Sequence, residues 1–320
     1  MRLVAGSLAP QEAGLSLLET YTLKGHRRYA LPVDALILSL RVDDLDGDGT
    51  NEILYVGADY AGVCRLYILN EAGVPLHTVE LGLCETAQIA TGDSDGDGKR
   101  EIAVHTHPGF LPGPPLLFFV EHDGAIRWFF EESIEITRWI EFTEYGLVTG
   151  GGGVSGEGFV ALRDFHSGEK TWRTALVFED GVSDASIHGI TFQAGGEYIA
   201  THTAQGLLFL LDQNDGYIFW KTITAHPDEN ERNRASGAPL VFVPGTESTP
   251  AFLAASQGGG SFRRSRFYAV SLSGNIMWEH QLYSPVSFAH GIHLPDGRPA
   301  ATVMTALGIY TFALGHEEEK

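Results

Sequence analysis

The sequence predicts an all-β fold, a β-propeller of four-stranded antiparallel blades, and three observations support this prediction. A nine-residue acidic segment occurs twice, 49 residues apart, a spacing typical of one blade per repeat. Short apolar segments alternate with glycine-containing turns along the 320 residues, and no long stretch shows helical periodicity. In successive repeats a bulky side chain follows the turn glycine by four residues.

The glycine and the bulky side chain form a recurring pair in six turns. The pairs are Gly25 and Tyr29, Gly73 and His77, Gly124 and Trp128, Gly168 and Trp172, Gly216 and Trp220, and Gly274 and Trp278. Four of the five Trp residues therefore occupy one position of the repeat. Because the position repeats, we interpret these side chains as packing between adjacent sheets rather than as a surface that stacks on a ligand.

Four strands are expected in each repeat. The first strands are residues 36–42, 87–91, 137–142, 187–192, 239–243 and 288–294; the second are 53–56, 102–105, 147–149, 198–202, 251–255 and 300–305; the third are 65–69, 116–120, 159–162, 207–211, 267–271 and 309–314. Residues 3–5, 15–19 and 27–31 add a second, third and fourth strand at the amino-terminal end. We expect seven blades in one domain, 1–320, in which strands from both ends close the ring. Six blades with a terminal hairpin are the alternative.

The two acidic segments carry the clearest chemical signal. They read Asp44-Leu45-Asp46-Gly47-Asp48-Gly49-Thr50-Asn51-Glu52 and Asp93-Ser94-Asp95-Gly96-Asp97-Gly98-Lys99-Arg100-Glu101. Carboxylates at positions 1, 3, 5 and 9 converge on a hard cation, glycine at position 6 permits the sharp turn, and position 7 offers a backbone carbonyl. An EF-hand needs Glu at position 12 between two helices, whereas Tyr55 and Val104 stand there and strand-like residues follow. We therefore expect each metal on a β-hairpin.

At these residues the chain resembles the FG-GAP/VCBS repeats of integrin-α-like β-propellers, which carry this loop between the first two strands of a blade and bind calcium there. The resemblance implies two structural Ca²⁺ ions. The implied ligands are Asp44, Asp46, Asp48, Thr50, Glu52, Asp93, Asp95, Asp97, Lys99 and Glu101. Later repeats lack the carboxylates, so we expect no third ion. The hairpins with the bulky side chain are similar to blades of quinoprotein-like (PQQ-like) propellers, which implies shared structure and not a quinone cofactor.

Composition excludes several functions. The formal net charge of −20 argues against nucleic acid and anionic membranes as partners. No segment is long and apolar enough to cross a bilayer. The chain shows no signal peptide, yet the calcium loops favour an extracytoplasmic location, and we expect a monomer. Cys64 and Cys84 do not make a disulfide framework, and a bond between them is the less favoured alternative.

A candidate ligand face lies at the opposite ends of the blades, where the loops between second and third strands and between successive blades are long. Its candidate residues are His105, His107, His202, Arg263 and Arg264. The two arginines belong to the only basic cluster in an acidic chain, and large loops at one rim of a rigid scaffold are common binding sites. A transition-metal site at the His105 and His107 pair is not favoured because no third ligand is in reach.

No motif of a hydrolase, zinc protease or nucleotide-binding loop is present, and we predict no catalytic residue. The favoured function is a non-catalytic, calcium-stabilised propeller that binds a protein or carbohydrate partner at the candidate ligand face. The alternative is a uronic-acid polysaccharide lyase on the same face. There His202, His105 or Tyr60 would abstract the proton, and Arg264 would neutralise the substrate carboxylate.

Overall fold

The computed structural model describes residues 3–8, 16–21, 26–132, 135–153, 158–176, 187–192, 197–203, 207–223, 236–243, 251–257, 265–282, 284, 286–294, 299–305 and 307–313. Within these residues all regular secondary structure is β-strand, as predicted. No helix long and apolar enough to span a membrane occurs among them.

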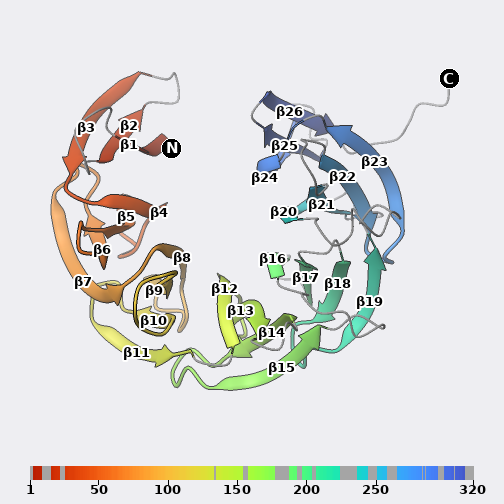
Figure 1. Cartoon of the computed structure of the whole chain (residues 1–320), viewed down its shortest axis with the longest axis horizontal. Helices are drawn as coiled ribbons and strands as arrows, with labels where there is room; N and C mark the ends of the chain where they lie inside the picture. The colour runs from red at the N-terminus through yellow and green to blue at the C-terminus, as the bar shows by residue number, and fades with distance from the viewer. Residues whose placement is uncertain are drawn as a thin grey trace. The chain divides into compact units, whose positions relative to one another are not determined.

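Five sheets have four strands each, paired in chain order (Figure 1). They are β4 (Leu36–Asp43), β5 (Glu52–Ala58), β6 (Val63–Leu69) and β7 (Pro75–Leu83); β8 (Thr86–Gly92), β9 (Glu101–His107), β10 (Leu116–Val120) and β11 (Ile126–Glu131); β12 (Glu135–Phe142), β13 (Leu147–Gly153), β14 (Gly158–Arg163) and β15 (Lys170–Leu176); β16 (Ile187–Phe192), β17 (Tyr198–Thr203), β18 (Leu207–Asp212) and β19 (Ile218–Ile223); and β20 (Ser236–Val243), β21 (Ala251–Gln257), β22 (Ser265–Ser271) and β23 (Ile276–Leu282).

Two sheets have only three strands. They are β1 (Leu3–Leu8), β2 (Ser16–Tyr21) and β3 (Arg27–Val33), and β24 (Val286–His293), β25 (Pro299–Thr305) and β26 (Gly308–Ala313). The described part of the chain therefore contains five complete blades, and the predictions of seven blades or of six are wrong. Sequence periodicity counts repeats, but a blade is complete only when four strands pair. The closure of the ring by both chain ends stays a prediction.

The chain divides into two compact units. The first comprises Met1–Leu147 with Arg163–Glu169, and the second comprises Val148–Leu162 with Lys170–Lys320. Both acidic segments, both cysteines and the pair His105 and His107 belong to the first unit. His202 belongs to the second unit, and Arg263 and Arg264 lie outside the described residues.

Adjacent sheets pack on each other through their middle strands, which read as continuous apolar runs in the sequence. All seven residues of β5 are buried. Leu54 and Leu66 of one sheet and Val104 of the next share one core in the first unit, while Leu208 and Val270 share another in the second. Fully burying such a side chain contributes about 1.5–3 kcal/mol. The stacked apolar strands therefore hold the acidic hairpins on a rigid base.

At four of the six pairs, those of Tyr29, Trp128, Trp172 and Trp220, the bulky side chain bonds to the next sheet, which confirms the packing interpretation there. The indole nitrogens of Trp128, Trp172 and Trp220 donate to the carbonyls of Phe165, Gln213 and Leu272 at 2.9, 3.0 and 2.7 Å, each in the turn of the next sheet. The Tyr29 hydroxyl donates likewise to Glu71. The five turn glycines within the described residues have φ between 72° and 85°, a left-handed conformation that favours glycine, and Gly25 lies outside the described residues.

Candidate functional site: two acidic hairpin loops

The acidic segments connect the first and second strands of two neighbouring sheets, as predicted. Residues 44–52, here called loop 1, run from the end of β4 to the start of β5. Residues 93–101, here called loop 2, run from β8 to β9. Neither loop is followed by a helix. The antiparallel register of each hairpin, Asp43 opposite Glu52 and Gly92 opposite Glu101, fixes where each loop begins and ends.

Backbone amides organise loop 1 around its aspartates. The two carboxylate oxygens of Asp44 accept from the amides of Gly47 and Gly49, both at 2.9 Å. Asp46 accepts from the amide of Asp48 at 3.2 Å. Asp48 accepts from the hydroxyl and the amide of Thr50, which lowers the pKa of its carboxyl group. These turns aim the three carboxylates at one place.

Loop 2 repeats this arrangement. Asp93 accepts from the amides of Gly96 and Gly98 at 2.7 and 3.0 Å. Asp95 accepts from the amide of Asp97, and Asp97 accepts from that of Lys99, at 3.1 and 2.8 Å. The glycines at loop positions 4 and 6 have φ between 76° and 86° in both loops. An L side chain is strained at such φ values, so the loop geometry depends on these glycines.

The glutamates at position 9 hold the loops from beneath. Oε2 of the buried Glu52 accepts from the Leu45 amide at 2.9 Å, and Oε2 of the buried Glu101 accepts from the Ser94 amide at 2.8 Å. Burial is the main cause that raises the pKa of Glu52, against the lowering effect of the Leu45 amide. The structure therefore shows a clamping contact for both glutamates, and their role as ligands stays a prediction.

The donors suit a hard divalent cation. One carboxylate oxygen from each of Asp44, Asp46 and Asp48 lies within 4.8 Å of the other two, and one from each of the three aspartates of loop 2 does the same. Ca²⁺ binds oxygen at about 2.3–2.6 Å, so two ligands of one ion lie at most about 5 Å apart. The two sets of aspartates therefore fit calcium in both donor type and spacing. The roles of the Thr50 and Lys99 carbonyls stay predictions.

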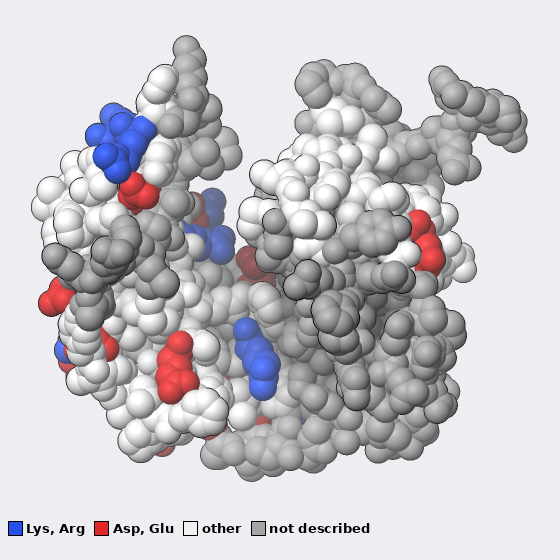
Figure 2. All heavy atoms as spheres, turned by 45° about the horizontal axis from the view of Figure 1, so that its top comes forward, with Lys and Arg blue, Asp and Glu red and all other residues white. Residues whose placement is uncertain are grey.

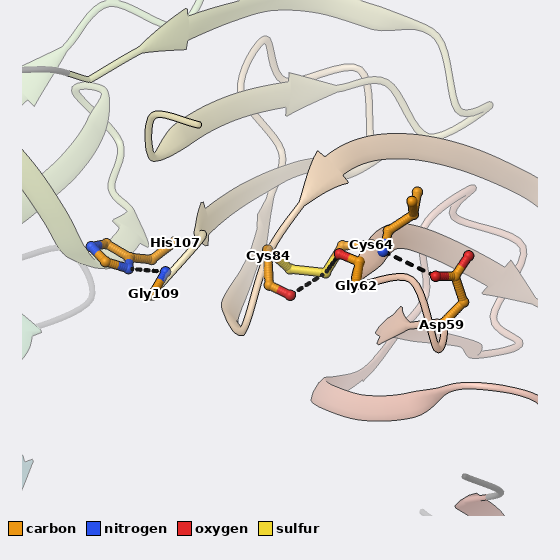
Figure 3. Close-up of a disulfide and its surroundings, with 7 residues drawn as sticks. Asp59, Gly62, Cys64, Cys84, His107 and Gly109 are labelled. Carbon is orange, nitrogen blue, oxygen red and sulfur yellow. Dashed lines mark hydrogen bonds between the residues drawn. A yellow bond between two sulfur atoms is a disulfide. The ribbon is translucent and has the colours of Figure 1, made fainter. Parts of the chain in front are cut away.

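At the other end of the same sheets, a disulfide joins Cys64 in β6 to Cys84, which follows β7 (Figure 3). The expectation that these cysteines stay unbonded is wrong. Their spacing of 20 residues gave no pairing signal, but Cys64 lies opposite Gly82 in the β6–β7 register, close to Cys84. The Cys84 amide donates to Gly62 at 3.0 Å, so the bond anchors the loop between β5 and β6.

The candidate histidines are mostly inaccessible. His105 and His202 are buried, with 4% and 0% exposure. His107 is half-buried, and its Nδ1 accepts from the Gly109 amide at 2.9 Å (Figure 3). Burial, and then the charge of Arg138, lowers the pKa of His107. Of the described candidates only His107 can contact a macromolecule, and binding at this face stays a prediction.

A buried polar cluster surrounds Glu132, between β11 and β12. Its carboxylate accepts from the amide and the hydroxyl of Thr137, both at 2.7 Å, and lies 3.5 Å from the Arg163 guanidinium. His105 Nε2 lies 3.8 Å away. Burial, followed by the charges of His107 and Arg138, lowers the pKa of His105 to about 3, so His105 and Glu132 do not form an ion pair at neutral pH.

Two exposed aromatic residues stand on the loops beside the disulfide. Tyr60, after β5, is 72% exposed, and Phe110, after β9, is fully exposed. The loops touch, because a Cβ at Gly62 would lie 2.7 Å from the Leu111 side chain. Asp59 accepts from the amides of Ala61 and Val63 and braces the first loop. Phe110 was not among the predicted site residues, although an aromatic residue between prolines and glycines in a long loop is a signal of exposure.

On the face drawn in Figure 2, the charged side chains of the described residues do not form one extended surface of a single sign. In the view of Figure 2, basic and acidic groups occupy small separate areas among neutral residues. Several are paired, such as Arg65 with Asp59 at 2.9 Å and Arg27 with Glu19 at 3.1 Å. On the face drawn, the described residues therefore offer no continuous basic track for a polyanion.

Comparisons with known proteins agree on the fold. No family model matches the chain, and no curated protein matches it. Among solved structures, the Dos1 propeller has a TM-score of 0.62 and 11% identity, over 95% of this chain and 76% of that one. Sqt1 of Saccharomyces cerevisiae has a TM-score of 0.67 and 13% identity, over 95% and 80%. BamB of Moraxella catarrhalis has a TM-score of 0.49 and 14% identity, over 100% and 98%. At these identities the similarity to Dos1 and Sqt1 shows a β-propeller fold alone.

Proposed function

We propose that this chain is a non-catalytic, calcium-stabilised β-propeller that binds a protein partner. The observation that supports it best is the pair of acidic hairpins, in each of which three aspartates converge on a preformed turn. The propeller fold shared with Dos1 and Sqt1 suggests an interaction scaffold. The disulfide fits an oxidising compartment, and extracellular calcium modules have Kd values of about 10⁻⁴–10⁻³ M.

Calcium in these loops would act on stability. The aspartates of an empty loop repel one another, and a bound divalent cation removes that repulsion. A ligand that binds only the folded loops stabilises the protein by mass action, by about 2.7 kcal/mol per site at one hundred times Kd. The amides that organise the loops come from the hairpins themselves, so the sites exist only in the folded chain.

Titration calorimetry on metal-stripped protein tests the calcium sites. We expect two Ca²⁺ ions per chain, one ion in Asp48→Asn and one in Asp97→Asn, because each change removes one ligand charge. Asn keeps an acceptor for the loop amide, so the turn persists. The melting temperature should rise with calcium and fall with chelator. Zero ions, or an unchanged melt after chelation, would contradict the proposal.

The partner is proposed to dock on Tyr60 and Phe110. Aromatic side chains bury large areas at low entropy cost and are enriched at binding hot spots. The disulfide and the Asp59 turn hold the Tyr60 loop in place, which reduces the entropy lost on binding. We favour a protein partner over a carbohydrate. The polar side chains beside these loops that could bind sugar hydroxyls, such as Asp59 and Arg65, are already paired with each other.

The docking face is tested by comparing wild type with Tyr60→Ala/Phe110→Ala. A partner identified by proximity labelling is purified and titrated against each form. We expect the double variant to lose at least tenfold in affinity, with an unchanged melting temperature. The matched control is Tyr145→Ala, an exposed tyrosine in the turn between β12 and β13, which should bind normally. Equal loss in both variants, or binding only to glycans, would overturn this part of the proposal.

Neither histidine proposed as the base supports the lyase alternative, whereas Tyr60, the third candidate base, is exposed and its role as a base stays a prediction. A base with a pKa of about 3, as for His105, is too weak to abstract a proton near neutral pH. His202 is fully buried and cannot reach a polymer. Incubation with a uronic-acid polymer should therefore produce no ultraviolet absorbance from a new double bond, and its appearance would identify an enzyme.

A further inference from the structure

The two acidic loops belong to neighbouring sheets, yet their backbones touch. The carbonyl of Leu45, at position 2 of loop 1, accepts from the amide of Arg100 in loop 2 at 2.8 Å. A Cβ built on Gly47 would lie only 2.8 Å from the Gly98 carbonyl oxygen. Both contacts involve backbone atoms of the segments that carry the aspartates. A change in the path of one loop therefore displaces the other.

Asp43 makes a second connection between the loops. Its Oδ1 accepts from the amide of Asp44, the first aspartate of loop 1, at 3.1 Å. Its Oδ2 accepts from the Arg100 guanidinium at 3.1 Å and from the Thr91 hydroxyl, which lie at the two ends of loop 2. The corresponding residue before loop 2 is Gly92, which has no carboxylate. Residues around loop 2 thus support loop 1.

We propose that the two loops bind their cations as a coupled pair, so that filling one loop raises the affinity of the other. This inference rests on the proposed calcium function. A cation in loop 2 would fix Gly98 and Arg100, and these would hold Gly47, Leu45 and Asp43 in their binding positions. Loop 1 then loses less conformational entropy when it binds. Linkage makes the effect reciprocal, so loop 1 raises the affinity of loop 2 by the same factor.

Repulsion between two divalent ions opposes this coupling. Because both loops are exposed, solvent weakens that repulsion. Asp46, Asp48, Asp95 and Asp97 are all exposed. Water and salt screen charges at such positions, with a Debye length of about 8 Å at physiological ionic strength. The backbone contacts between the loops are not screened. Added salt should therefore weaken the binding of each single ion but increase the coupling factor.

The coupling factor is measured by calorimetry on metal-stripped protein titrated with calcium chloride. The coupling factor is the overall association constant for two ions in wild type, divided by the product of two single-site association constants. One single-site constant is measured in Asp48→Asn and the other in Asp97→Asn. We expect a factor of about five or more, the lower end of common coupling strengths. Two working sites with a factor of one or less would overturn the coupling and leave the calcium function intact. Absence of calcium binding would overturn both.

A matched pair of glycine variants separates coupling from local strain. Gly47 and Gly96 occupy the same loop position, with φ of 76° and 79°, so alanine strains both loops similarly. Only Gly47→Ala presses on the other loop, because a Cβ at Gly96 has nothing within 4 Å. We measure the coupling factor in each background with the same aspartate variants. It should fall towards one in Gly47→Ala and keep its wild-type value in Gly96→Ala.

A second pair avoids glycine strain. Arg100→Gln removes the guanidinium that binds Asp43 but keeps the backbone amide that binds Leu45, whereas Lys99→Gln removes a neighbouring charge that makes no described contact with loop 1. Both changes alter the affinity of loop 2, but only Arg100→Gln should lower the coupling factor. A coupling factor that is unchanged in both Gly47→Ala and Arg100→Gln overturns the inference.

Discussion

At the residue scale, the same side chain can hold a loop or bind an ion, and its neighbours decide which. The spacing in the sequence makes Glu52 and Glu101 look like the ninth ligand of each loop. In the structure both are buried and accept from the amide of loop position 2. The aspartates lie at the surface, with oxygens close together. Burial under the loop thus separates the clamping glutamates from the aspartates that are proposed to bind a cation.

His105 should make stability depend on pH. Its pKa is about 3 in the folded chain and about 6.5 when unfolded, so below pH 6.5 the unfolded state binds more protons. Folding stability is therefore lost progressively as the pH falls from 6.5 towards 3. Each pH unit in this window is worth about 1.4 kcal/mol, so wild type should lose about 2–3 kcal/mol between pH 7 and pH 4.5 from this group.

Urea unfolding of wild type and His105→Gln at pH 7 and pH 4.5 measures this effect. Gln does not titrate, so the variant should lose less stability on acidification, even if it is less stable at pH 7. Every other titratable group is common to both proteins. An equal loss of stability in wild type and His105→Gln would show that folding does not lower the pKa of His105.

At the element scale, the latch between sheets is an indole N–H group that donates to a backbone carbonyl of the next sheet, and this contact recurs along the chain. Trp172→Phe keeps the aromatic ring but removes the donor to the Gln213 carbonyl. An unsatisfied buried partner costs about 1–3 kcal/mol, so we expect a loss of that size in unfolding free energy. Trp278→Phe is the control, because Trp278 packs on Phe267 and Phe312 and shows no indole hydrogen bond within the described residues.

Chemical denaturation of both variants, with circular dichroism as the signal, provides the comparison. Trp278→Phe should cost less than Trp172→Phe, since both lose the same ring area and only one loses a hydrogen bond. Equal losses would show that ring packing, and not the indole donor, provides the latch's stability.

At the scale of the whole molecule, calcium should stabilise one region and not the entire chain. Both acidic loops lie in the first compact unit, and each continues directly into a buried strand, β5 or β9. Ligand binding suppresses only those opening events that disrupt the site. Chelation should therefore speed amide hydrogen exchange in β5 and β9 and leave β18, in the second unit, unchanged.

Hydrogen-exchange mass spectrometry with and without chelator measures this difference. The variant Asp48→Asn/Asp97→Asn serves as the control, because its exchange should not respond to chelator at all. Equal acceleration in β5 and β18 would show that the loops stabilise the chain globally.

The sequence predicted those features that depend on local chemistry. Glycines at left-handed positions, the bulky side chain four residues later and alternating aspartates each act within a few residues, so hairpins, latches and acidic loops follow from the printed residues. Blade number could not be obtained this way, because it depends on which strands pair. The accessibility of His105 and His202 was missed for a similar reason, since stacking of sheets and not residue type buries them.

By itself the sequence determined an all-β chain of antiparallel four-stranded repeats with two acidic hairpins, since turn chemistry and side-chain periodicity are local properties. Only the tertiary structure decided that five blades are complete, that Cys64 meets Cys84, and that Leu45 bonds to Arg100. The physical reason is common to all three. Each depends on which separate strands and sheets bury their apolar faces against one another, and the disulfide and the Leu45–Arg100 bond join residues 20 or more apart.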